Sequence, residues 1–250
     1  MMMLESVMIA FSMFSAIPMP QREWNERNIR YSLCAFPLVG AVIGVCGWGW
    51  WRLCLRFALP QLLRGAGLCL LPVMITGGIH LDGYADTWDA LACHGSREKR
   101  QEILKDPHLG AFAGIRLCMY FTATLALWTV AEELPLTVLM GIFALSRTLS
   151  GLALVTFPLR EGSGLARLFA EAAERKSVRM ALLALGALLL TLLCLKGAWP
   201  AAPAAAGVFL VWRRMCVRDF GGLSGDLAGW FVQTAELWML AAVILRQLIN

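Results

Sequence analysis

Residues 180–198 read MALLALGALLLTLLCLKGA, and Lys196 is the only charged side chain among them. At 1.5 Å per residue, a helix of about 20 mostly apolar residues is long enough to cross a bilayer. This stretch therefore predicts a membrane-spanning helix. The composition extends the prediction to the whole chain, because 59% of the 250 residues are hydrophobic and 16% are charged. Soluble domains have roughly 45–50% apolar and about 25% charged residues, so we expect an integral membrane protein.

Six further apolar runs lie along the chain, with prolines near several of their ends. Together with the first they predict seven spans, near residues 33–57, 62–81, 110–131, 135–158, 180–198, 201–212 and 227–249. The run at 201–212 falls short of a full span. Residues 1–20 carry no basic residue of the kind that opens a signal peptide, and they predict an interfacial or partly inserted helix. The predicted fold is all-α: a polytopic integral membrane helix bundle of about seven transmembrane helices plus that N-terminal helix, in one domain over residues 1–250.

The basic residues test the predicted topology. Fifteen of the 22 Lys and Arg residues fall in four alternate loops, residues 20–32 (with Arg22), 82–109, 159–179 and 213–226. The turns between those loops, near 58–61, 132–134 and 199–200, hold none. Cytoplasmic loops carry the excess of Lys and Arg, so the four basic loops are predicted to face the cytoplasm. Arg52 and Arg56 depart from this pattern. The formal charge of +5 follows from these loops, and no nucleic-acid partner is expected.

An acidic motif follows the second predicted span. Residues 76–91 read TGGIHLDGYADTWDAL, which places Asp82, Asp86 and Asp89 at spacings of four and three. On a helix these carboxylates fall within about 60° of one another and form one acidic face. Oxygen ligands grouped in this way suit Mg²⁺ or Mn²⁺, hard cations that bridge carboxylates and substrate phosphates. An exposed acidic turn is the alternative, but it does not require the glycines that flank the first Asp.

A second glycine turn repeats this order of residues. FGGLSGDLAGW, residues 220–230, has the spacing Gly-Gly-x-x-x-Asp with Gly221, Gly222 and Asp226, as the first motif does with Gly77, Gly78 and Asp82. Glycines let the backbone approach a ligand closely, and the backbone N–H groups of such turns bind anions. Both turns are predicted at the cytoplasmic edge. We therefore expect them to share one site.

Cations and further acids accompany the two glycine turns. Lys105 and Asp106 lie in EILKDPHLGAF, and Arg160 follows the fourth span. Arg147 lies inside that span, where an arginine costs about 2.5–3.5 kcal/mol and is expected to face a polar cavity, with snorkelling or an internal ion pair as the alternatives. Carboxylates, glycine turns and cations on one face predict a site that handles a diphosphate with a divalent metal. The sequence has no G-x-S-x-G, Walker A, G-x-G-x-x-G or H-E-x-x-H motif.

Five motifs in order resemble those of the adenosylcobinamide-GDP ribazoletransferases, also called cobalamin synthases. They are TGGIHLDGYADTWDA, EILKDPHLGAF, the pair Ser146-Arg147, Arg160 with Gly162 and Gly164, and GGLSGDLAG. The resemblance covers nearly the whole chain, and five motifs in the same order are more specific than any one of them.

The resemblance implies a multi-pass enzyme of the bacterial inner membrane whose active site faces the cytoplasm. It implies Mg²⁺-dependent joining of adenosylcobinamide-GDP to α-ribazole or its 5′-phosphate, with release of GMP. Asp82, Asp86 and Asp89 would be catalytic and bind Mg²⁺, with Asp106 or Asp226 completing or replacing a ligand. The expected phosphate-binding residues are Lys105, Arg147, Arg160, Gly77, Gly78, Gly221 and Gly222. Association with other enzymes of the corrinoid pathway is a further expectation.

Other functions remain open at this stage. A CDP-alcohol phosphotransferase or a polyprenyl-type transferase would also join an alcohol to a diphosphate-activated donor, although the acidic motifs of these enzymes have different spacing. A cation-coupled transporter would need charged groups near the bilayer midplane. In this chain most of the acidic residues are predicted at one membrane edge.

Overall fold

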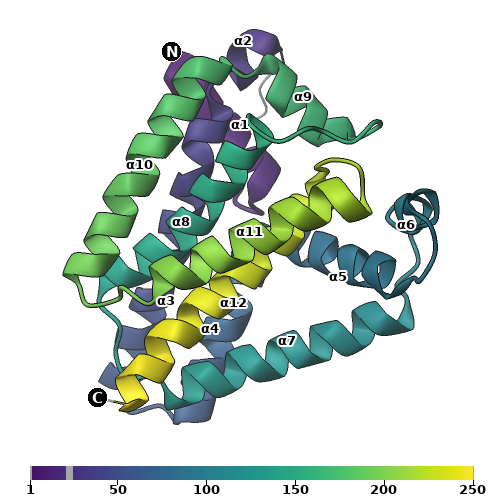
Figure 1. Ribbon diagram of the computed structural model, residues 1–250. Coiled ribbons are helices and arrows are strands. Elements are labelled where there is room, and N and C mark those ends of the chain that lie inside the picture. Colours follow the sequence, from purple (N-terminus) through teal and green to yellow (C-terminus); the bar gives the residue numbers. More distant parts are fainter. Residues whose placement is uncertain (1, 21–24, 250) are drawn as a thin grey trace.

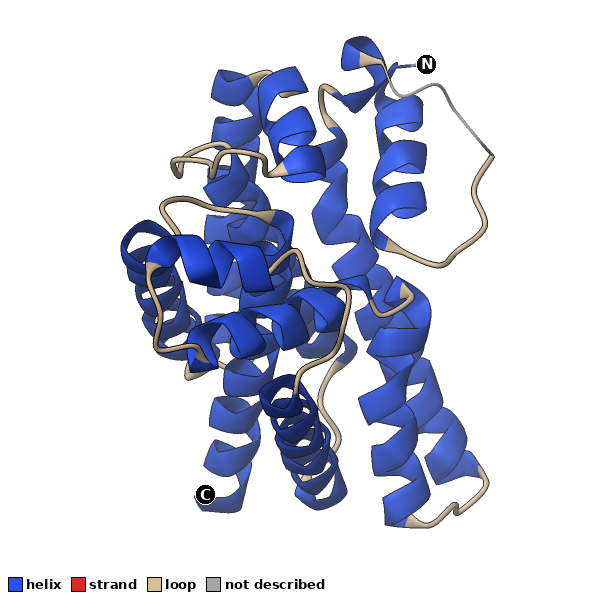
Figure 2. Ribbon diagram, turned by 90° about the vertical axis from the view of Figure 1, so that its right-hand side faces the viewer, coloured by secondary structure: helices blue, strands red, loops and turns tan. Residues whose placement is uncertain are grey.

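The chain folds entirely into helices joined by short segments. The computed structural model describes residues 2–20 and 25–249, and this part contains no β-strand (Figures 1 and 2). The all-α prediction is therefore confirmed. Arg22 of the first basic loop lies outside the described residues. The helices are α1 Met2–Phe14, α2 Glu26–Ile29, α3 Ser32–Arg56, α4 Gln61–Thr76, α5 Ile79–Ala92, α6 Arg97–Ile103, α7 Ala111–Val130, α8 Leu136–Leu154, α9 Gly164–Ala172, α10 Arg175–Leu195, α11 Ala201–Asp219 and α12 Gly225–Ile249.

Within the described residues, five helices are long and apolar enough to cross a membrane: α3, α7, α8, α10 and α12. The bent pair α4 and α5 brings the number to six if it counts as one span. The protein is thus a multi-pass membrane protein, but the predicted count of about seven is not confirmed. The sixth predicted span, 201–212, belongs to α11, which continues to Asp219 and is not among these candidates because its last turns carry several charges. The predicted N-terminal helix corresponds to α1, which packs against α3.

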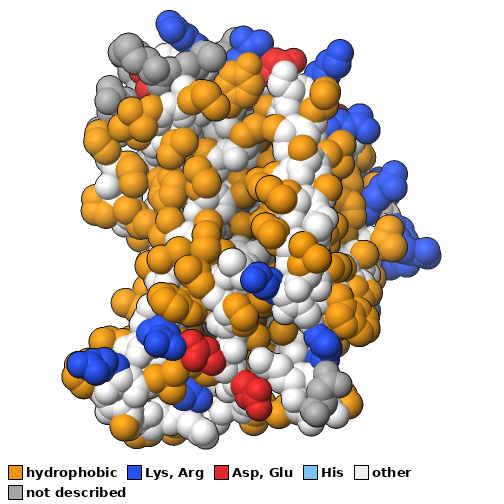
Figure 3. All heavy atoms as spheres, turned by 90° about the vertical axis from the view of Figure 1, so that its left-hand side faces the viewer, with side chains coloured by type: hydrophobic (Ala, Val, Ile, Leu, Met, Phe, Trp, Pro, Cys, Tyr) orange, Lys and Arg blue, Asp and Glu red, His pale blue; other side chains and the backbone are white. Residues whose placement is uncertain are grey.

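Helix α8 is the centre of the bundle, and α10 lies at its periphery. Of the most apolar 18-residue stretch of each helix, 72% is buried within the protein in α8 and 22% in α10. Leucines such as Leu183 and Leu188 of α10 are exposed. The face shown in Figure 3 is mostly hydrophobic over its middle, with Lys and Arg gathered towards its edges. Such a belt suits a helix bundle whose outer surface faces lipid.

Small residues let α3 approach α8 closely. A Cβ atom on Gly40 would lie within van der Waals overlap of the Phe143 carbonyl, and one on Gly44 would overlap the backbone at Met140. Glycines four apart on one helix face allow this kind of backbone contact between membrane helices. The position of α8, and of the site that forms at its end, therefore depends on α3.

The predicted span 62–81 is broken in the structure. Helix α4 ends at Thr76, α5 begins at Ile79, and the two helix axes differ in direction by 96°. Gly77 and Gly78 have φ values of 65° and 81°, in the left-handed region that a residue with a Cβ rarely adopts. Consequently α5 extends to the side of the bundle, above α7 in Figure 1. The range 82–109, predicted as a loop, contains most of α5 and all of α6.

We predict that Gly40→Ala lowers the stability of the bundle. The new methyl group would meet backbone atoms of α8, and overpacking of this kind costs about 1–3 kcal/mol. Thermal unfolding in detergent micelles measures the effect. Gly49→Ala is the matched control on the same helix, because nothing lies within 4 Å of its added Cβ. Equal unfolding temperatures for both variants would contradict the close approach of α3 and α8.

Candidate active site

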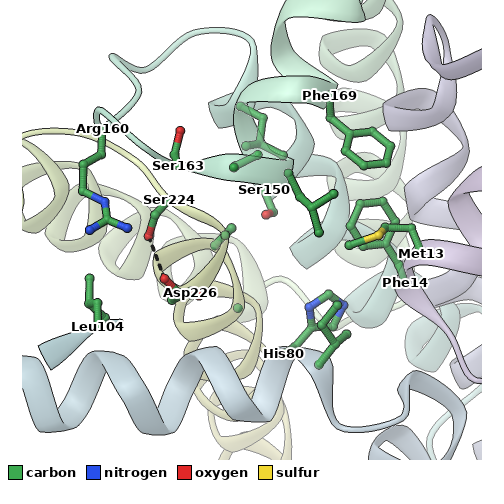
Figure 4. A pocket seen from close by; sticks show the side chains of 18 of the residues that line it. Met13, Phe14, His80, Leu104, Ser150, Arg160, Ser163, Phe169, Ser224 and Asp226 are labelled. Carbon is green, nitrogen blue, oxygen red and sulfur yellow. Dashed lines mark hydrogen bonds between the residues drawn. The ribbon is translucent and has the colours of Figure 1, made fainter. Parts of the chain in front are cut away.

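A cavity of about 350 Å³ forms where the first turns of α5, α9 and α12 meet the end of α8. Its lining comes from distant parts of the chain and includes Phe14, His80, Lys105, Ser150, Arg160, Ser163, Phe169 and Asp226. Figure 4 shows Arg160 on one side of the cavity and Phe14 and Phe169 on the other. The cavity thus has a charged end and an aromatic end.

Arg160 brings a positive charge that lacks a partner. The residue is 5% exposed, and its Nε and Nη1 atoms are buried without a hydrogen-bond partner among the described residues. The guanidinium acts electrostatically on Asp226 but forms no ion pair within the described chain. A buried cation with free donors is costly unless an anion binds to it. Arg160 is therefore suited to hold a phosphate group in the cavity.

The second glycine turn fixes the backbone of Arg160. The Arg160 N–H donates to the Leu223 carbonyl at 2.9 Å, and the Leu223 N–H donates to the Pro158 carbonyl at 2.8 Å. A Cβ atom on Gly222 would lie 2.5 Å from the Arg160 nitrogen, so the two segments can approach only because this residue is glycine. Gly221 and Gly222 do not line the cavity. In the structure Gly222 packs against Arg160 and Gly221 against Arg97, and their predicted contact with phosphate stays a prediction.

Two helix N-termini open on the same cavity. Helix α9 begins at Gly164 and α12 at Gly225, and both glycines line the cavity. The first N–H groups of a helix lack intrahelical partners, and the helix dipole adds positive partial charge there. Lys105, which follows α6, also lines the cavity. These groups and Arg160 together make the charged end favourable for an anion.

The carboxylates of α5 and α12 meet where the two helices cross. A Cβ atom on Gly83 would lie 2.7 Å from the Asp226 carbonyl oxygen, so the helix backbones are nearly in contact. Asp82, Asp89 and Asp226 all act electrostatically on Asp86. None of these four carboxylates forms an ion pair with any residue that the structure describes. The crossing therefore gathers four carboxylates, and the electrostatic effect of Arg160 on Asp226 is not accompanied by an ion pair in the described structure.

Asp89 and Asp106 have other partners. Asp89 accepts hydrogen bonds from the N–H groups of Gly110 and Ala113, at 2.7 and 2.8 Å, and so caps the N-terminus of α7. Asp106 is exposed and accepts from the His108 N–H at 3.0 Å. Hydrogen bonds from the His108 backbone and ring hold the pKa of Asp106 below its usual value. Of the other three predicted metal ligands, Asp226 accepts one long hydrogen bond, from the Ser224 hydroxyl at 3.3 Å (Figure 4). Asp82 and Asp86 form no ion pair in the described chain.

Asp82, Asp86 and Asp226 could hold a magnesium ion only if waters and substrate phosphates supplied its other ligands. In the part of the chain that the structure describes, no group of three or more His, Cys, Asp or Glu side chains forms a ready metal cage. Mg²⁺ does not need one, because it keeps several waters and binds through one or two carboxylates and substrate phosphates. Unneutralised oxygen donors beside a cavity with an anion-binding end have the chemistry that such an ion requires.

Arg147 does not line the cavity. It is fully buried and forms an ion pair with Glu236 of α12, and it also donates to the Phe143 carbonyl at 2.9 Å. The structure thus shows the internal ion pair that was the alternative interpretation of this residue. Glu236 was missed in the sequence, although an acidic residue inside an apolar run is a signal that it pairs with an intramembrane arginine.

The remaining predicted phosphate ligands, Gly77 and Gly78, also lie outside the cavity lining. Their left-handed conformations turn the chain into α5, which carries His80 to the cavity wall. Sequence reasoning missed Ser150 and Ser163, whose hydroxyls are buried in the wall without a partner in the described residues. A serine in an apolar helix gives no signal of this role, because most such hydroxyls bond to their own helix.

A family model described as cobalamin-5-phosphate synthase matches residues 6–244. The chain belongs to this family. It is 38% identical to the adenosylcobinamide-GDP ribazoletransferase of Lachnoclostridium phytofermentans, over 98% of this chain and 95% of the relative. It is 32% identical to the protein of that name from a Geobacillus species, over 93% and 92% of the two chains. A Clostridium perfringens protein of that name is 29% identical over 93% and 94%. No solved structure matches.

Membership of the cobalamin-5-phosphate synthase family makes this protein an enzyme of the transferase class. The resemblance drawn from the five sequence motifs is confirmed over nearly the whole chain. The family match covers every segment that lines the cavity, from Met13 to Gly229.

We predict that Glu236→Gln destabilises the protein by about 3–5 kcal/mol, because it leaves the Arg147 charge buried without a counter-charge. The double variant Arg147→Met, Glu236→Met should recover most of that loss. Thermal unfolding in detergent measures both. If Arg147→Met alone unfolded at the wild-type temperature and lost only activity, Arg147 would serve the substrate rather than this ion pair.

Proposed function

We propose that the protein joins adenosylcobinamide-GDP to α-ribazole or its 5′-phosphate and releases GMP. The observation that carries this proposal is the guanidinium of Arg160, which forms no ion pair in the described chain, in a cavity that Asp226 also lines. Asp82 and Asp86 do not line the cavity, but they lie at the crossing of α5 with α12, where Asp82 and Asp226 act electrostatically on Asp86. A diphosphate brings the negative charge that Arg160 lacks, and its complex with Mg²⁺ brings the positive charge that the carboxylates lack. The names of the relatives support this choice of substrates.

The reaction exchanges the phosphoanhydride bond of the diphosphate for a new phosphate ester bond. A ribazole hydroxyl oxygen attacks the phosphorus on the cobinamide side of the diphosphate. The bond from this phosphorus to the bridging oxygen breaks, and the electron pair leaves with GMP. A carboxylate of the α5 and α12 crossing accepts the hydroxyl proton. Atoms and charge balance without any further reactant.

The residues of the cavity position the diphosphate for this exchange. Arg160, Lys105 and the N-termini of α9 and α12 bind its oxygens, which holds the phosphorus in place and stabilises charge as the bond breaks. Asp82, Asp86 and Asp226 would hold Mg²⁺, which neutralises the phosphates when bound. Asp89 keeps the start of α7 in position beside this cluster.

We also propose that the enzyme lies in the bacterial inner membrane with this site towards the cytoplasm. The alternation of basic loops supports the orientation, because Arg160 and Lys105 belong to loops with an excess of cations. Nucleotide substrates are available on that side.

We predict that Arg160→Gln lowers kcat/KM by about 10²–10³-fold, the usual effect of removing one donor that stabilises transition-state charge. Release of GMP by purified protein in lipid nanodiscs measures it. Arg167→Gln is the matched control, since Arg167 is exposed on α9 and pairs only with Glu171 in the described structure. Wild-type turnover in Arg160→Gln would refute the phosphate-binding role.

We predict that Asp226→Asn raises the Mg²⁺ concentration needed for half-maximal turnover by at least roughly tenfold, because a metal ligand loses its charge. Asp106→Asn should leave this requirement unchanged, because Asp106 is exposed and bonded to His108. Magnesium titration of turnover compares the two variants. The opposite result, a shift in Asp106→Asn alone, would place the metal elsewhere.

A further inference from the structure

The end of the cavity away from Arg160 is walled by aromatic rings. The centroids of Phe14 and Phe36 are 4.2 Å apart, those of Phe14 and Phe169 are 5.5 Å apart, and those of Phe36 and His80 are 5.6 Å apart. These rings come from α1, α3, α5 and α9, so four helices converge on this wall (Figure 4). A cluster of this kind offers flat apolar surface to a ligand ring.

Three polar side chains without partners in the described chain line the cavity: His80 near the aromatic rings, Ser150 between the two ends, and Ser163 towards Arg160 (Figure 4). His80 is 5% exposed, Ser150 1% and Ser163 7%. The Nε2 atom of His80 and both serine hydroxyls are buried, and none of them has a hydrogen-bond partner among the described residues. Burying such groups unpaired costs about 1–3 kcal/mol each. A purely apolar occupant would leave this cost in place, whereas a ring with nitrogen and oxygen atoms would remove it.

The two ends together define the class of ligand. One end binds an anion through Arg160 and two helix N-termini, and the other combines aromatic surface with unpaired polar atoms. Its volume of about 350 Å³ is at the small end of the range of roughly 300–1,000 Å³ for ligand sites. A nucleotide has this size and this distribution of polarity. A corrin macrocycle is much larger and must stay outside.

We propose that the aromatic end is a base subsite, in which His80 and Ser150 hydrogen-bond to a flat bicyclic nitrogen base while Arg160 holds the phosphate of the same nucleotide. A neutral imidazole can donate or accept at Nε2, and a hydroxyl can do both, so the pair can read ring heteroatoms of either kind. The identity of the nucleotide rests on the proposed function. Its two sources are the guanylate half of the donor and phosphorylated ribazole, which share this chemistry.

Binding of product-like ligands tests the subsite without catalysis. We would measure dissociation constants by calorimetry for GMP, α-ribazole 5′-phosphate and ribose 5-phosphate, which lacks a base, with protein in nanodiscs. At least one nucleotide should bind tenfold or more tightly than ribose 5-phosphate. Ser150→Ala and His80→Phe should each raise the dissociation constant of that nucleotide by about tenfold, which corresponds to the loss of one hydrogen bond. Neither substitution should change the dissociation constant of ribose 5-phosphate.

Thr234→Val is the matched control, because Thr234 has another buried hydroxyl without a partner in the described chain but does not line this cavity. Thr234→Val should change the dissociation constant of neither the nucleotide nor ribose 5-phosphate. A preference for GMP assigns the subsite to the donor, and a preference for ribazole phosphate assigns it to the acceptor.

Equal affinity for ribose 5-phosphate and both nucleotides would overturn the subsite, as would a preference that survives in both Ser150→Ala and His80→Phe. The proposed function fails separately. If the base preference holds but the complete enzyme with Mg²⁺ forms no joined product, the subsite stands and the assigned reaction is wrong. If the joined product forms but no base preference is found, the assigned reaction stands and the base subsite is wrong.

Discussion

The crossing of α5 over α12 is the constraint on which the site depends. It requires two pairs of glycines: Gly77 and Gly78 turn the chain by 96°, and Gly83 and Gly229 let the two helix backbones touch. A side chain at either contact would push α5 away. Asp82 and Asp86 would then move away from Asp226, and His80 would leave the cavity wall. The glycines of the acidic motif are therefore explained by packing as much as by ligand contact.

The protein treats its buried arginines in two ways. Arg147 forms an ion pair with Glu236 inside the bundle. The Glu236 carboxylate compensates the arginine charge, and the pair links α8 to α12. Arg160 is nearly as buried but forms no ion pair within the described chain, although it acts electrostatically on Asp226. Its backbone is hydrogen-bonded to the loop before α12. A buried charge without an ion-pair partner is costly in a low-dielectric interior. The environment of Arg160 therefore indicates a binding site for a ligand anion.

The sequence predicts what depends on local composition and misses what depends on contacts. The apolar runs predict α3, α7, α8, α10 and α12, because span length is a local property. Composition does not distinguish a straight span from one bent at Gly77, so the predicted range 62–81 is wrong as one helix. For the site, the helical spacing correctly groups Asp82 with Asp86. The partner of Arg147 lies 89 positions away in the chain, and the capping role of Asp89 depends on α7, so neither follows from spacing.

The central claim is that carboxylates at this crossing and Arg160 hold opposite sides of one metal-bound phosphate. Electron paramagnetic resonance of Mn²⁺ added to the purified protein with GMP tests it most directly, because Mn²⁺ replaces Mg²⁺ at oxygen sites. The account predicts a protein-bound Mn²⁺ signal with coupling to the phosphorus of GMP, and loss of that bound signal in Asp86→Asn. A bound Mn²⁺ without phosphorus coupling, or a signal unchanged in Asp86→Asn, would contradict the account.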